Sequence, residues 1–302
     1  MSRLKLNLII ASASFSLLVV SCATTAPDSA TPLTATRVEG AYTIPKQIRY
    51  SYTLKNTTGQ LLTKADFWTY APIPHTAHQR RVKIQSNLAY TTSQDDLGNE
   101  MLHFDIANLP PYGMRVVSVT VDLLMAAAPV AESSTTGDRF IKPEHHIESN
   151  DPQMITLAKS LQDAAAPGQS TKTAYTWVAD HVFADSYIPE DRGALYALTT
   201  RKGDCTEFAY LLTALYRAQG IPARPIGGYV FAGNEVVKPA DFHNWTEFYA
   251  HGAWQLADAQ KGAYEEKQTH YVAMRRITAE AKDAFNAQRF SYAGDGLEVT
   301  MN

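Results

Sequence analysis

Apolar and polar side chains alternate along the first half of the chain, over residues 47–125. In the clearest segment Val117, Val119, Val121 and Leu123 share one face, and polar side chains take the other. A period of two is typical of a half-buried β-strand. Clusters rich in Asn, Asp, Gly and Pro, typical of turns, interrupt the alternation at 56–59, 95–99 and 109–113. We therefore predict a small antiparallel β-domain.

Helical periodicity replaces this alternation after residue 150. Asp151 followed by Pro152 is an N-cap with a first-turn proline, and an apolar stripe follows it. A second helix is predicted from about Thr171 to Ala184. Residues 126–140 are rich in Ala, Ser, Thr and Gly, which is typical of a linker.

A third helix begins at Cys205. Asp204 is placed as its N-cap and Glu207 as the partner in a capping box, and Gly220 followed by Ile221-Pro222 ends it. Cys205 then lies in the first turn, where the helix dipole lowers the pKa of a thiol by less than about one unit. Activation therefore requires a neighbouring imidazolium, and we expect a histidine nearby.

A β-hairpin is predicted from His243 to Asp258, because two alternating stretches flank Ala250-His251-Gly252. A turn at Ala250-His251 places His243 opposite Asp258. A turn at His251-Gly252 pairs His243 with Gln260 instead and leaves Asp258 as a diagonal neighbour on the same face. Either register lets a carboxylate hold the imidazole.

Cys205, His243 and Asp258 thus fit the roles of nucleophile, base and orienting acid. The backbone N–H of Cys205 is the natural first oxyanion donor. Tyr187 and Trp245 are candidates for the second donor, and Tyr229 and Trp245 are candidates for lining the cleft.

The start of the chain has the pattern of a secretion signal, with Arg3 and Lys5 before an apolar run that ends at Cys22. The run is shorter than the roughly 20 residues that span a membrane. Val19-Val20-Ser21-Cys22 resembles the bacterial lipoprotein processing site, so we expect a lipid anchor at Cys22 on the periplasmic face of the outer membrane. An ordinary signal peptide cleaved near Ala23 is the alternative.

Composition narrows the function further. The 302 residues carry a net charge of −3 without long basic runs, which argues against a nucleic-acid partner. We expect no metal site and no cofactor, because neither zinc-ligand nor phosphate-loop spacing is evident.

The chain has two cysteines. If Cys22 carries lipid, Cys205 has no disulfide partner within the chain. An unpaired thiol in an exported protein is either buried and inert or retained as a reactive group.

Three sequence blocks together resemble the transglutaminase-like superfamily: the segment 202–209 around Cys205, the segment 243–249, and the segment 254–258. The resemblance implies an α+β, papain-like core in which a central helix packs against an antiparallel sheet. It also fits a small all-β domain before that core. Asn244 departs from the pattern, since a small residue is common after the histidine.

We therefore predict the following division: signal peptide 1–21, tether 22–40, β-rich domain 41–128, linker 129–150 and catalytic domain 151–302. The expected function is an envelope cysteine hydrolase that cleaves amide bonds of peptides or proteins through a thioester. An amine-accepting transglutaminase is one alternative. A catalytically silent, lipid-anchored scaffold is another.

Overall fold

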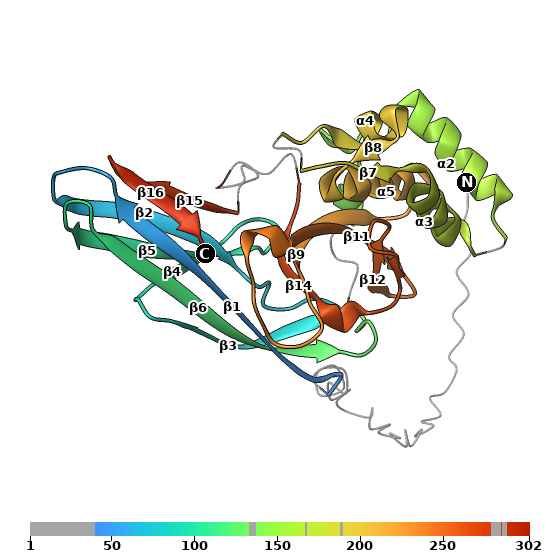
Figure 1. The fold of residues 1–302 in the computed structure, drawn as a ribbon. Helices are drawn as coiled ribbons and strands as arrows, with labels where there is room; N and C mark the ends of the chain where they lie inside the picture. Colours follow the sequence, from blue (N-terminus) through green and yellow to red (C-terminus); the bar gives the residue numbers. More distant parts are fainter. Residues whose placement is uncertain (1–39, 133–136, 167, 188–189, 279–284, 286–288) are drawn as a thin grey trace, which may run out of the picture.

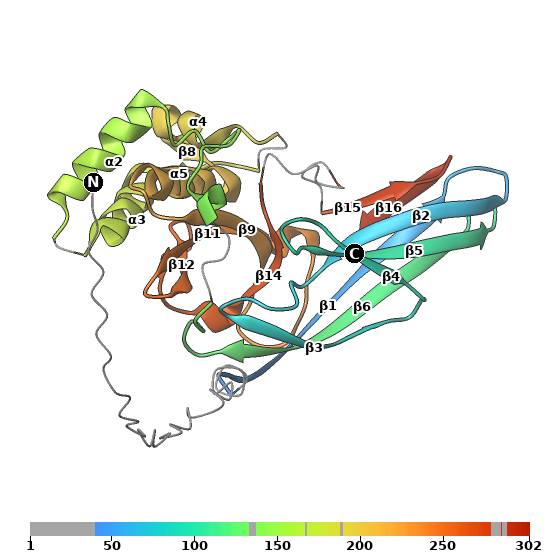
Figure 2. The same cartoon turned by 180° about the vertical axis from the view of Figure 1, so that it is seen from behind.

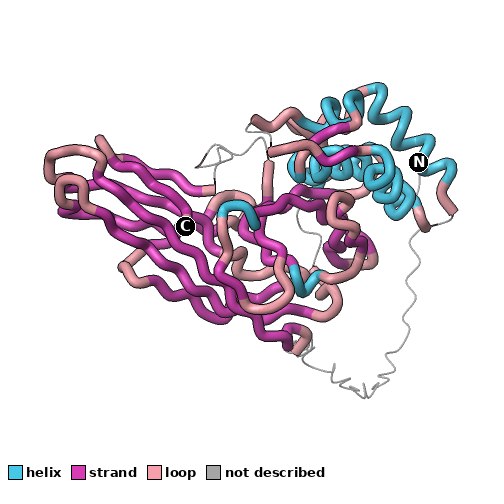
Figure 3. Tube along the Cα trace, in the orientation of Figure 1, coloured by secondary structure: helices cyan, strands magenta, loops and turns pink. Residues whose placement is uncertain are grey.

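The computed structural model describes residues 40–132, 137–166, 168–187, 190–278, 285 and 289–302. A β-sandwich lies at one end of the molecule, and the helices gather at the other end around a second sheet (Figures 1 and 3). Cys22 and the predicted signal and tether lie outside the described residues. Among the described helices none is long and apolar enough to cross a membrane.

Two sheets form the sandwich. The first has the order β10-β1-β6-β3, with β16 also paired to β1, and the second has the order β15-β2-β5-β4. Their bounds are β1 Tyr42–Asn56, β2 Leu62–Ala71, β3 Gln79–Ser86, β4 Thr91–Gln94, β5 Glu100–Leu109, β6 Met114–Ala126, β10 Glu235–Val236, β15 Phe290–Ala293 and β16 Leu297–Met301.

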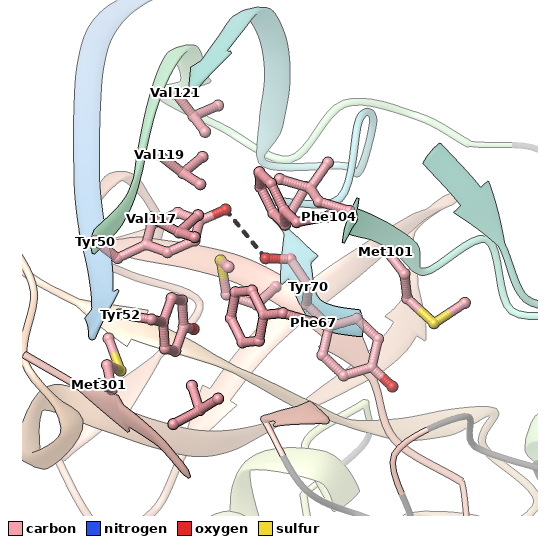
Figure 4. Packing of buried hydrophobic residues seen from close by; sticks show 14 of the residues in the cluster. Tyr50, Tyr52, Phe67, Tyr70, Met101, Phe104, Val117, Val119, Val121 and Met301 are labelled. Atoms are coloured by element: carbon pink, nitrogen blue, oxygen red, sulfur yellow. Dashed lines mark hydrogen bonds between the residues drawn. The ribbon is translucent and has the colours of Figure 1, made fainter. Parts of the chain in front are cut away.

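The sandwich core confirms the predicted apolar face of β6. Val117, Val119 and Val121 are fully buried and point at the aromatic side chains of the facing strands (Figure 4). The Tyr50 hydroxyl donates to the backbone oxygen of Tyr70 at 3.0 Å, so its polar end is satisfied inside the core.

The second unit contains the helices and the sheet β13-β12-β11-β9-β14. Helix α5 is central, and most of its side chains are buried against β9, β11 and the other helices. The bounds are α2 Pro152–Ala164, α3 Ser170–His181, α4 Gly193–Thr200, α5 Cys205–Ala218, β9 Ala223–Val230, β11 Phe242–Ala250, β12 Ala253–Asp258, β13 Ala263–Tyr264 and β14 Tyr271–Arg276. Short elements complete it: β7 Phe183–Ala184 paired with β8 Lys202–Gly203, and the 3-10 turns η1 Gly137–Phe140, η2 Pro239–Asp241 and η3 Gln268–His270.

The predicted division differs from the structure in two places. The range 151–302 groups β15 and β16 with the catalytic residues, whereas these strands pair with β2 and β1 of the sandwich (Figure 2). The range 129–150 was expected to be a linker, yet its described residues from 137 onward include contacts with the second unit: Phe140 is buried against Trp254, and Glu144 forms an ion pair with Arg217. Both differences arise from contacts between residues far apart in the sequence.

The two units share one continuous core. Tyr229, Val272 and Met274 of the second sheet pack into the sandwich cluster. Gln79 reinforces this junction because its amide group donates to the backbone oxygen of Ala273 at 2.9 Å and accepts from the N–H of the same residue at 2.8 Å. The sandwich is therefore structurally fused to the sheet that carries the candidate site.

Candidate active site

Cys205 is the first residue of α5, and the predicted cap is present. The Asp204 carboxylate accepts from the N–H of Thr206 at 2.8 Å, and the Glu207 carboxylate accepts from the N–H of Asp204 at 3.1 Å. Glycine is required at 203, because a Cβ there would lie 2.3 Å from the Cβ of Glu207. The local sequence thus fixes where the helix starts and where the thiol lies.

Cys205 is a free cysteine whose pKa is raised to about 11. Burial is the main cause, and the charge of Asp204 adds to it. The backbone N–H of Asn244 and the hydroxyl of Thr206 act in the opposite direction and lower the pKa of the thiol. These surroundings favour the neutral thiol, so a thiolate here requires a cation beside it.

His243 and Asp258 form a buried hydrogen bond. The distance from His243 Nε2 to Asp258 Oδ2 is 2.7 Å, and both side chains are less than a tenth exposed. His243 lies at the start of β11, and Asp258 is the last residue of β12. The contact expected between an imidazole and a carboxylate of this hairpin is present.

The hairpin register is the second of the two predicted alternatives. Ala250 pairs with Ala253, so the turn consists of His251 and Gly252, with φ of 54° and 77°. Positive φ at both central residues is typical of the tight turn that matches strand twist. A turn at Ala250-His251 is wrong. Asp258 consequently reaches His243 as a diagonal neighbour on the same face.

Asn244 connects the two halves of the site. It follows His243 directly, and its side-chain Nδ2 donates to Thr206 Oγ1 at 3.0 Å. The start of β11 is therefore held against the start of α5. The sequence marked Asn244 only as a departure from the superfamily pattern.

Asp258 has two further donors. The N–H of Lys261 bonds to its Oδ1 at 3.0 Å, and the hydroxyl of Tyr271 bonds to its Oδ2 at 2.9 Å. Burial raises the pKa of Tyr271, so this side chain remains a hydroxyl donor. The sequence analysis missed Tyr271. Tyr271 is the first residue of β14.

The aromatic candidates lie in different surroundings. Tyr187 is 74% exposed. Tyr229 does not line the site, because its ring is buried in the sandwich core and its hydroxyl donates to the sulfur of Met301 at 3.5 Å. Trp245 is buried against Tyr271, and its Nε1 has no hydrogen-bond partner among the described residues.

The described residues also form a cavity and a cluster of possible metal ligands, neither of which includes Cys205. A cavity of about 640 Å³ is lined by ten residues, none of which is Cys205, His243 or Asp258. On the sandwich, Asp66, His103 and Asp105 bring possible metal-ligand atoms within 4.8 Å of one another. His103 Nε2 already forms a hydrogen bond with Asp66 Oδ1 at 2.8 Å, so two of the three side chains are engaged with each other.

Part of the chain is similar to known proteins. Residues 155–259 match the profile of the transglutaminase-like superfamily. A protein-glutamine gamma-glutamyltransferase of Pseudomonas aeruginosa is 32% identical over 137 residues, which are 42% of this chain and 19% of that protein. The match thus spans about a fifth of the relative's length.

One solved structure supports the fold, and a second is also similar in part. A protein of Cytophaga hutchinsonii, described as a candidate cysteine protease, superposes with a TM-score of 0.56 at 20% identity, covering 86% of this chain and 92% of that one. The periplasmic domain of TgpA from Pseudomonas aeruginosa gives a TM-score of 0.37 at 18% identity, covering 74% and 89% of the two chains.

Proposed function

Because residues 155–259 form a transglutaminase-like domain, we propose that the protein is a cysteine hydrolase that cleaves amide bonds of peptides or proteins through a thioester on Cys205. One observation carries the proposal: Cys205, a free cysteine, is the first residue of a buried helix, and Thr206 of that helix is hydrogen-bonded to Asn244, the neighbour of His243 in the buried His243–Asp258 pair.

The proposed chemistry follows from which nitrogen of His243 is already hydrogen-bonded. Asp258 occupies Nε2 of His243, which leaves Nδ1 to take the proton of the Cys205 thiol. The thiolate attacks the carbonyl carbon, and the helix-start N–H of Cys205 stabilises the oxyanion. The imidazolium then returns its proton to the amine as the C–N bond breaks. Water, activated by the same imidazole, hydrolyses the thioester and regenerates the thiol.

Labelling of Cys205 with iodoacetamide tests the nucleophile, because only the thiolate reacts. We expect labelling near pH 7 to be faster than that of a free thiol, despite the burial that raises the pKa of Cys205. Cys205→Ala should abolish turnover of envelope peptides while leaving the thermal transition in place. Labelling no faster than a free thiol, or loss of the folded state in the variant, would contradict the proposal.

An amine-accepting transglutaminase is the second candidate, and the name of the Pseudomonas relative favours it. Glutamine peptides incubated with a labelled primary amine separate the two reactions by mass spectrometry. The hydrolase yields cleaved or deamidated peptide, and the transferase yields peptide carrying the amine. Predominant amine-coupled product would replace the hydrolase assignment.

We also propose that a lipid on Cys22 holds the protein at the periplasmic face of the outer membrane. The charged start and apolar run before Cys22 support this placement. Cys22→Ser should move the protein from the membrane fraction to the soluble envelope fraction. Retention in the membrane fraction would argue against the anchor.

A further inference from the structure

Tyr271 shares one oxygen of Asp258 with His243. Its hydroxyl lies 2.9 Å from Oδ2, and His243 Nε2 lies 2.7 Å from the same atom. The other oxygen, Oδ1, accepts the N–H of Lys261. Three donors therefore fix the plane of the carboxylate and select which oxygen faces the imidazole.

The tyrosine is itself held firmly. It is 4% exposed, and the ring of Trp245 packs edge-on against it with 5.1 Å between ring centroids. Because burial raises the pKa of Tyr271, it donates a proton in the hydrogen bond across the neutral pH range. Hydrogen bonds to a charged acceptor are roughly twice as strong as those between neutral groups.

The sandwich fixes the strand that carries Tyr271. Two residues further along β14, Ala273 accepts from the N–H of Ile73 at 2.9 Å and exchanges two hydrogen bonds with the side chain of Gln79. Gln79 is fully buried and also donates to the backbone oxygen of Ile73 at 2.8 Å. The position of β14, and with it Tyr271, thus depends on residues that belong to the β-domain.

We propose that Tyr271 is a positioning residue: it orients Asp258, which in turn orients His243, and the β-domain contributes to catalysis by holding β14 in place. The inference rests on the proposed role of Asp258 in the Cys205 reaction. Loss of the hydroxyl leaves the carboxylate free to turn about its Lys261 contact. The imidazolium is then held less well, and the thiolate that it stabilises becomes less populated.

Tyr271→Phe in the full chain tests this, because it removes one oxygen atom and keeps the ring. Tyr264→Phe is the matched control, since the Tyr264 hydroxyl bonds to Thr171 at 2.7 Å and to none of the three proposed catalytic residues. The readouts are the rate of Cys205 alkylation by iodoacetamide between pH 5 and 10 and the melting temperature of each variant.

We expect Tyr271→Phe to slow alkylation at pH 7 about tenfold, with the midpoint of the pH profile rising by about one unit. Tyr264→Phe should follow the wild-type profile. A Tyr271→Phe profile that superimposes on wild type would overturn the inference. So would an equal slowing at every pH, because general damage to the fold gives that result. A wild-type thiol that labels no faster than a free thiol is a separate result, and it refutes the proposed function itself.

Discussion

Asp258→Asn is the sharpest perturbation of the proposed site, because it removes the charge and nearly preserves the shape. Asp258 is 2% exposed, and its Oδ2 lies 2.7 Å from His243 Nε2. Two unit charges about 4 Å apart, at an effective dielectric constant of about 20, attract each other by roughly 4 kcal/mol. Each 1.36 kcal/mol corresponds to a factor of ten. Losing the carboxylate should therefore lower the population of the thiolate–imidazolium pair about a thousandfold.

The assay is iodoacetamide labelling of Cys205 at pH 7, followed by mass spectrometry, with peptide turnover as the second readout. The control is Asp163→Asn, the same chemical change at an exposed residue of α2 that forms an ion pair with Lys159 on the same helix. The control should match wild type in labelling rate. If Asp258→Asn slows labelling less than tenfold while remaining folded, Asp258 does not orient the base.

Three further predictions concern stability. Burial raises the pKa of Glu207 to about 7 from 4.5, so the folded state binds a proton that the unfolded state releases. Wild type should therefore lose about 1–3 kcal/mol relative to Glu207→Gln between pH 5 and 8; a constant difference in melting temperature would contradict this. Arg217→Met removes the guanidinium that lies 2.6 Å from the buried Glu144 carboxylate and should cost about 3–5 kcal/mol by urea unfolding, with partial recovery on adding Glu144→Gln. A Cβ at Gly228 would lie 2.1 Å from a backbone oxygen of β14. Gly228→Ala should therefore lower the melting temperature, whereas Gly233→Ala, with open space around it, should leave it unchanged.

Local chemistry made part of this structure predictable from sequence. The start of α5 follows from Asp204 and Glu207, whose side chains cap the helix without help from the rest of the protein. The buried face of β6 follows from alternation alone. The hairpin turn was decidable in principle, because His251 and Gly252 tolerate positive φ better than Ala250 does.

Contacts between distant segments were not predictable in this way. No local pattern indicates that Tyr271 reaches Asp258 across the sheet, or that Tyr229 turns its ring toward the sandwich rather than toward Cys205. The packing of 129–150 depends equally on partners such as Arg217, more than 70 residues away. These features arise from tertiary contacts, which the local patterns of periodicity and helix capping do not indicate.

The pairing of β16 with β1 has a consequence for how the chain reaches its native state. Leu54 faces Val299, so this part of the sandwich closes only after residue 299 has been synthesised. Such high contact order slows folding. Until β16 arrives, part of β1 presents an open strand edge to other molecules. A variant that lacks residues 297–301 would retain Cys205, His243 and Asp258 yet be prone to aggregation while it folds, so its dependence on chaperones should rise.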